Sequence, residues 1–248
     1  MATTTAAPAA FLAALRTGAA VPPPAGVPAW LWQLATALHG ELPPPAADAW
    51  ATRLHGLLGT ARAPAGLRAV HVWQADTVLP LLAGTADTAD TAEPTALHRA
   101  AAGGTPADRN TWRSALGPLL LRLHDAAYDR ASAYAEGHRG ARDHALANGY
   151  SAPEADAYGH AYARLSTEAN ARAFAEAHAQ ALGTALGAAY AADDARAYAD
   201  TFPEAQLKAV VRATATTSET SRPQPLLLAD GLLSALTAVK ESLTRPGV

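Results

Sequence analysis

Asn148-Gly-Tyr-Ser-Ala-Pro-Glu154 is the stretch of sequence that decides the fold. Asn148 and Gly149 tolerate the left-handed backbone conformation that closes a helix, so a helix is predicted to end there. Ser151 and Glu154 have the spacing of a capping box, in which the Ser oxygen accepts a backbone hydrogen bond and the Glu side chain reaches back to the Ser amide. A second helix is therefore predicted to begin directly after the first one ends.

Ala-rich sequence extends on both sides of this turn. The upstream helix is predicted to open at Thr105-Pro106, to be interrupted and restarted at Gly117-Pro118, and to end near Ala147. The downstream helix is predicted to run to about Tyr190. Because the turn is tight, the two helices should form a long antiparallel hairpin. The small facing side chains predict a close approach of the two helices.

The whole chain is predicted to be all-α, because no stretch alternates apolar and polar residues as a half-buried strand does. All five Trp precede residue 113 and all seven Tyr follow residue 127, so the two halves are built differently. The expected fold is a helical bundle in which short Trp-anchored helices pack against the hairpin. The predicted organisation is a short-helix N-terminal part at 1–84, a Thr-Ala-Asp linker or loop at 85–95, a helical hairpin bundle at 96–215, a linker at 216–228 and a C-terminal amphipathic helix at 229–243. Leu232, Leu236, Val239 and Leu243 share one stripe of that last helix.

Composition restricts the classes of partner and chemistry. The net charge is −3 and no run of Lys or Arg neutralises several phosphates, so no nucleic-acid partner is expected. The absence of Cys excludes disulfides, thiolate zinc sites and iron–sulfur clusters. No window holds about 18 uninterrupted apolar residues, so no membrane partner is expected. Arg16 follows the first apolar stretch, which is the wrong order for a secretory signal, and a cytoplasmic location is expected.

Histidines of the hairpin are the best candidates for a functional site. Counted from the turn, His138 should face His160, and His124 should face the segment that carries Glu176 and His178. The predicted catalytic group is His124, Asp125, Glu176 and His178. The predicted binding group is Glu136, His138, His160, Tyr128 and Tyr162.

Imidazole titrates near neutrality, which suits acid–base chemistry, and in its neutral form it is also a good metal ligand. The spacings lack the Glu-x-x-His and His-Glu-x-x-His patterns, and no nucleotide-binding or hydrolase motif is present, so neither a metal nor a cofactor is predicted. The alternative is that these histidines are structural, either on a polar face or buried with their hydrogen bonds satisfied.

Two further features of the downstream helix concern its outer surface. Arg164, Glu168, Arg172 and Glu176 step by four residues and should form a solvated ladder of ion pairs. Tyr158 and Tyr162 share a face with Leu165 and are expected to pack against a third element.

Two functions remain open from the sequence, which does not decide whether the chain is an enzyme. The first is a helical binding or scaffolding protein, whose hairpin and C-terminal helix present a surface to another protein or to a second copy of the chain. The alternative is a metal-independent enzyme or small-molecule-binding protein, in which His, carboxylate and Tyr groups line a cavity between helices.

Overall fold

The computed structural model describes residues 8–18, 21–59, 66–84, 89–215 and 223–244. These residues form α-helices and one π-helical turn, with no strand among them, which confirms the predicted all-α fold. The helices are α1 Pro8–Thr17, α2 Ala29–Glu41, α3 Pro44–Gly59, α4 Arg68–Trp73, η1 Gln74–Val78, α5 Leu79–Ala83, α6 Ala89–Ala102, α7 Arg109–Ala127, α8 Arg130–Ala147, α9 Ala152–Ala191, α10 Ala195–Ala199, α11 Pro203–Ala215 and α12 Gln224–Thr244. Across these ranges, none of the helices combines the length and apolarity that crossing a bilayer requires.

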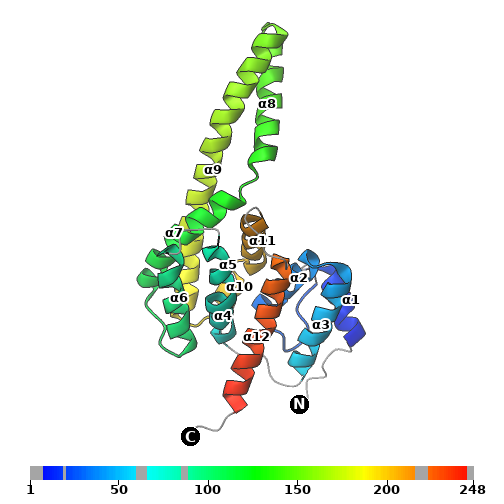
Figure 1. Cartoon of the computed structure of the whole chain (residues 1–248), viewed down its shortest axis with the longest axis vertical. Helices are drawn as coiled ribbons and strands as arrows, with labels where there is room; N and C mark the ends of the chain where they lie inside the picture. The colour runs from blue at the N-terminus through cyan, green and yellow to red at the C-terminus, as the bar shows by residue number, and fades with distance from the viewer. Residues whose placement is uncertain (1–7, 19–20, 60–65, 85–88, 216–222, 245–248) are drawn as a thin grey trace.

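The molecule has a rounded body and one projecting arm (Figure 1). The arm consists of α8 and the first half of α9, and its tip is the turn between these helices. The second half of α9 continues into the body, where α7 packs along it. One continuous helix therefore connects the arm to the core of the protein.

Tryptophans anchor the body, as predicted. Trp30 and Trp50 are fully buried in a core that also includes residues of α7, α9, α11 and α12. The indole Nε1 of Trp50 donates to the carbonyl of Ala229 at 2.8 Å, and that of Trp73 donates to the carbonyl of Leu228 at 3.0 Å. Because both acceptors lie on α12, these bonds join the C-terminal helix to the N-terminal part of the chain.

A stripe of small residues holds α9 against its neighbours. A Cβ added at Gly159 would lie 2.9 Å from the backbone oxygen of His138, and one at Gly187 would lie 2.8 Å from that of Arg109. This close approach agrees with the sequence prediction. Each step of four residues advances the contact line by about 40°, so the stripe winds from α8 to α7 along the helix. Its buried members are Ala155, Gly159, Ala163, Thr167, Ala171, Ala175, Ala179, Gly183 and Gly187.

The turn between α8 and α9 confirms the prediction from the capping stretch. Asn148 is the C-cap of α8, and Gly149 has a φ of 86°. The backbone amide of Ser151 donates to Oε2 of Glu154 at 3.0 Å, as a capping box requires. Burial of small residues and this local turn chemistry together fix the hairpin.

The predicted interruption at Gly117-Pro118 is wrong, because both residues lie inside α7. The upstream segment breaks instead at residues 128–129, between α7 and α8. The carboxylate of Asp129 accepts from the backbone amide of Ser132 at 3.0 Å and so caps α8. A single Pro removes only one backbone hydrogen bond, whereas this cap starts a new helix.

The predicted loop at 85–95 is wrong for residues 89–95, which belong to α6, while residues 85–88 lie outside the described ranges. Thr91 is buried on this helix, and α6 packs against α4 and α7. The predicted linker at 216–228 is wrong for residues 224–228, because α12 begins at Gln224 and buries Leu228. Residues 216–222 and the side chain of Leu243 lie outside the described part.

Candidate functional site

His124 and His178 meet at the base of the arm, as predicted. Their ring centroids are 4.8 Å apart. Phe174 lies against both rings, with its centroid 4.0 Å from that of His178 and 6.0 Å from that of His124. Tyr128 packs on the same phenyl ring at 5.5 Å. The environment of this histidine pair is therefore aromatic.

Burial controls the electrostatics of this pair. Burial, with a smaller contribution from the nearby His178, lowers the pKa of His124 to about 4. Within the described residues, the buried Nε2 of His124 has no hydrogen-bond partner. Nδ1 of His178 donates to the carbonyl oxygen of Phe174 at 2.8 Å. His124 is thus neutral at pH 7 and too weak a base to accept a proton efficiently there.

The structure does not bring the two carboxylates of the predicted catalytic group to these rings. Oδ1 of Asp125 accepts from the guanidinium of Arg130 at 2.8 Å. Glu176 is exposed on α9. Among the contacts made by the described residues, neither carboxylate reaches His124 or His178. The group therefore lacks the partner that would orient an imidazole for acid–base catalysis.

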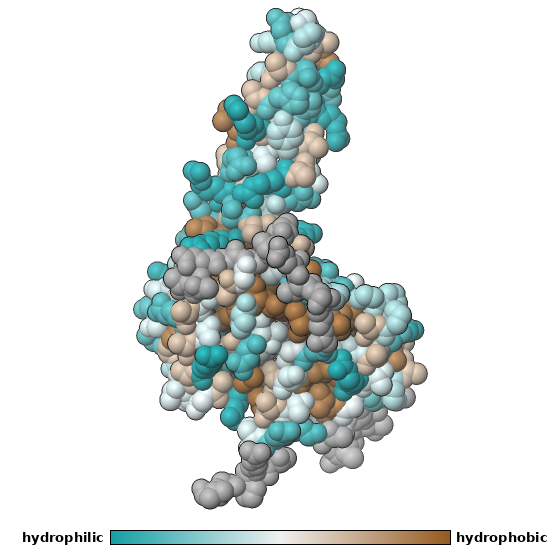
Figure 2. Space-filling view, in the orientation of Figure 1, coloured by the Kyte–Doolittle hydropathy of each residue, from teal (hydrophilic) through white to brown (hydrophobic). Residues whose placement is uncertain are grey.

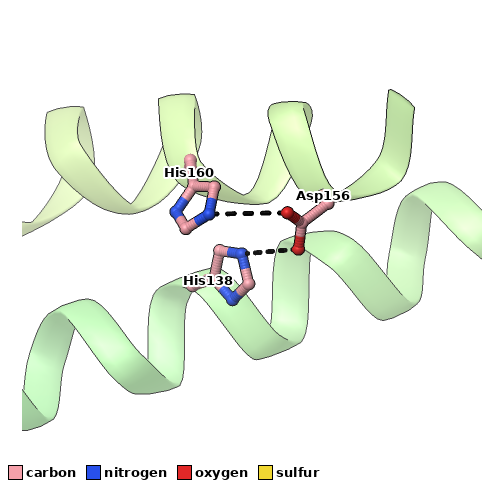
Figure 3. A group of neighbouring side chains, drawn as sticks. All are labelled: His138, Asp156 and His160. Atoms are coloured by element: carbon pink, nitrogen blue, oxygen red, sulfur yellow. Dashed lines mark ion pairs between the residues drawn. The ribbon is translucent and has the colours of Figure 1, made fainter. Parts of the chain in front are cut away.

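His138 and His160 meet in the second histidine layer, also as predicted, with ring centroids 4.2 Å apart. Asp156 lies beside both rings and pairs with each of them (Figure 3). Its Oδ1 is 3.3 Å from Nε2 of His138, and its Oδ2 is 3.5 Å from Nε2 of His160. The hydroxyl of Tyr134 is 2.7 Å from Nδ1 of His160.

Asp156 and Tyr134 were missed by the sequence analysis, although the sequence carries a signal for both. Asp156 precedes His160 by four residues, and Tyr134 precedes His138 by four, so each pair shares a helix face. Glu136, which the sequence placed in this binding group, is exposed, and no contact between described residues links it to either ring.

Three donor atoms converge in this layer, one from each of His138, Asp156 and His160, all within 4.8 Å of one another. Two imidazoles and a carboxylate are the ligand set of several zinc proteins. This is the group of described residues that could hold a metal ion.

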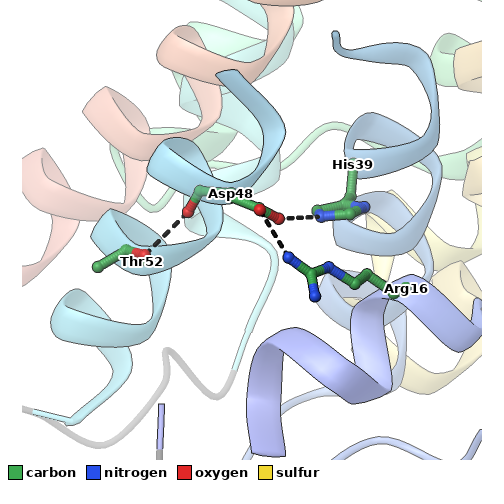
Figure 4. Close-up of polar contacts among 4 residues, drawn as sticks. All are labelled: Arg16, His39, Asp48 and Thr52. Atoms are coloured by element: carbon green, nitrogen blue, oxygen red, sulfur yellow. Dashed lines mark hydrogen bonds and ion pairs between the residues drawn. The ribbon is translucent and has the colours of Figure 1, made fainter. Parts of the chain in front are cut away.

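A surface cluster in the body shows a different arrangement (Figure 4). Asp48 on α3 accepts from the guanidinium of Arg16 at 2.6 Å and lies 3.4 Å from Nε2 of His39. The guanidinium of Arg16 is the main cause that lowers the pKa of the Asp48 carboxyl. The short ion pair already occupies this carboxylate. Because Arg16, His39 and Asp48 come from α1, α2 and α3, the cluster joins these three helices, which is a structural role.

A buried histidine pair in the body was not predicted. Nδ1 of His71 and Nδ1 of His98 are 2.8 Å apart, and the aromatic rings of Trp112 and Tyr190 surround them. Desolvation lowers the pKa of His71 to about 4 and that of His98 well below its usual value. Both rings are therefore neutral at pH 7, and one donates to the other. No local motif connects these distant segments, so sequence reasoning had no signal for the pair.

A small cavity adjoins this pair. Its volume is about 50 Å³, and its polar lining includes His98, Tyr190, Tyr198 and Gln74 of the π-helical turn η1. Burial raises the pKa of both tyrosines. A cavity of this size holds a few water molecules, whereas ligand pockets measure about 300–1,000 Å³.

The outer face of the arm carries an exposed stripe formed by Tyr158, Tyr162 and Leu165. Their exposed fractions are 43%, 50% and 68%. The spacing of four and three residues places them on one face of α9. The expectation that these tyrosines pack against a third element is wrong, because no described element covers them. On the face of the arm that Figure 2 shows, hydrophilic residues predominate, with scattered hydrophobic ones.

Comparisons with known proteins add no family to this description: no family model, no curated protein and no solved structure matches the chain.

Proposed function

We propose that the chain is a helical binding or scaffolding protein whose arm associates with the arm of a second copy. The observation that carries this proposal is the exposed stripe of Tyr158, Tyr162 and Leu165 on a helix that extends away from the body. Large apolar side chains gathered on one helix face are unfavourable in water unless a partner covers them. Tyrosine is also enriched at protein interfaces, where its ring packs and its hydroxyl stays hydrated.

The spacing within the stripe favours a second copy as the partner. In an antiparallel pairing of two α9 helices, Tyr158 of one copy lies opposite Leu165 of the other when the symmetry axis passes close to Tyr162. The stripe is then complementary to itself, as a two-fold interface requires. Few side chains take part, so we expect a weak and concentration-dependent dimer, unlike an obligate one.

The alternative of a metal-independent enzyme receives less support. His124 has a pKa of about 4, and the carboxylates Asp125 and Glu176 do not contact it. A general base at neutral pH needs a pKa near the working pH and a group that orients it.

Sedimentation equilibrium of the untagged chain tests the proposed association. The weight-average mass should rise with concentration for the wild type, and the double variant Tyr162→Gln, Leu165→Gln should weaken the association at least about tenfold. Leu121→Gln is the matched control, because Leu121 is an exposed apolar residue on α7, in the body. A wild type that stays monomeric up to about 1 mM, or equal effects of both variants, would overturn the proposal.

A further inference from the structure

We propose that His138, Asp156 and His160 form a zinc-binding site that joins α8 to α9 within the arm. The proposal does not rest on self-association, because all three ligands belong to one chain. His138 comes from α8, while Asp156 and His160 come from α9 (Figure 3).

Two of the distances between ligand atoms match those around a tetrahedral ion. Zinc binds imidazole nitrogen and carboxylate oxygen at about 2.0–2.2 Å, so two tetrahedral ligands lie roughly 3.3–3.5 Å apart. The observed separations from Asp156 oxygens are 3.3 Å to Nε2 of His138 and 3.5 Å to Nε2 of His160. Each imidazole faces a different oxygen of Asp156, and the three ligand atoms lie within 4.8 Å of one another, so side-chain rotation has to draw them together around a zinc ion.

The surroundings prepare both imidazoles for coordination through Nε2. Nε2 of His138 is buried and makes no hydrogen bond within the described part of the chain. The hydroxyl of Tyr134 lies 2.7 Å from Nδ1 of His160 and can accept its proton, which leaves the lone pair on Nε2. A Cβ at Gly159 would lie 3.0 Å from Cδ2 of His138, so a residue without a side chain there lets this ring approach α9.

The ligand chemistry selects zinc over the common alkaline-earth ions. Imidazole suits zinc, copper and nickel, whereas magnesium and calcium prefer oxygen ligands. Three protein ligands leave the fourth tetrahedral position for water. The site thus resembles open zinc sites in its donor set, although its ligands lie on the surface of the arm.

One neighbouring charge opposes the metal. Nε of Arg142 lies 3.7 Å from Oδ1 of Asp156, and Nη1 of the same residue lies 3.9 Å from Oδ1 of Asp143. The pair with Asp156 is longer than the 2.6 Å pair between Arg16 and Asp48. Arg142 can therefore turn towards Asp143 when a cation binds, and its positive charge lowers the affinity of the site.

Competition titration of the metal-free, full-length protein with zinc and a chromophoric chelator tests the site. We expect one zinc per chain at this site and no competition from an excess of magnesium. Asp156→Asn and His138→Gln should each weaken zinc binding at least about tenfold, because each removes a ligand. His144→Gln is the matched control, since His144 lies on the same helix outside the group.

Two further measurements distinguish a specific site from general binding to histidines. Arg142→Ala should tighten zinc binding several-fold, because it removes the competing cation. Zinc should raise the melting temperature of the wild type and of His144→Gln but not that of Asp156→Asn, whose far-UV circular dichroism checks that it is folded. Equal zinc affinity of the wild type and Asp156→Asn, or no binding at about 100 µM zinc, would overturn the proposal.

Discussion

The close contact between α7 and α9 predicts that Gly187→Ala destabilises the protein. The added Cβ would lie 2.8 Å from the backbone oxygen of Arg109 and 3.4 Å from the backbone nitrogen of Arg113. Both neighbours are backbone atoms, so the two helices must move apart. Overpacking of this kind costs about 1–3 kcal/mol, and the better helix propensity of Ala returns about 0.5–1 kcal/mol. The net loss expected from these two effects is about 0–2.5 kcal/mol.

Gly140→Ala is the matched control, because Gly140 is an exposed helical residue with no atom within 4 Å of the added Cβ. This variant should gain about 0.5–1 kcal/mol from helix propensity alone. Urea denaturation followed by far-UV circular dichroism measures both changes. If Gly187→Ala stabilises the protein as much as Gly140→Ala does, the small-residue stripe does not hold the helices in the described contact.

Three further predictions concern titration, a cap and an anchor. The free energy of unfolding should fall as the pH drops from about 6.5 towards 4, because the lowered pKa values of His71 and His124 in the folded protein let the unfolded chain bind protons at a higher pH than the folded chain does. Denaturation at pH 7 and pH 5 measures this difference in stability. His124→Gln should make the difference smaller. Asp129→Ala should cost about 1 kcal/mol by removing the cap of α8, and an unchanged denaturation midpoint would contradict that role. Trp50→Phe should lower the free energy of unfolding by about 1–3 kcal/mol, because it removes the hydrogen bond to Ala229. The backbone amides of α12 should then exchange with solvent faster than in the wild type.

The hairpin and its two histidine layers were predictable because local chemistry determines them. The capping stretch that ends at Glu154 placed the turn, and helical geometry then placed His138 opposite His160. The break at Asp129 was not predictable in the same way. A Pro at 118 and an Asp at 129 both signal a helix boundary, but Pro118 is accommodated inside α7, whereas the cap made by Asp129 starts α8.

Long-range packing explains most of what the sequence did not reveal. The segment 89–95 has the composition of a loop, yet it becomes helical where Thr91 is buried. His71 on α4 and His98 on α6 meet between two aromatic rings, Trp112 of α7 and Tyr190 of α9, so four helices that are separate in the sequence build this pair. Asp156 is a different case, because its spacing of four residues from His160 is visible in the sequence and places both side chains on one helix face.

Site-specific cross-linking tests most directly whether the arm stripe is a self-association surface. The chain contains no Cys, so one introduced thiol reports one position. If two α9 helices pair about an axis near Tyr162, then Tyr162→Cys should form a disulfide-linked dimer under mild oxidation, since the paired Cα atoms come within about 7 Å. Leu121→Cys, in the body, should stay monomeric. Cross-linking of Leu121→Cys as extensive as that of Tyr162→Cys would contradict the proposed interface.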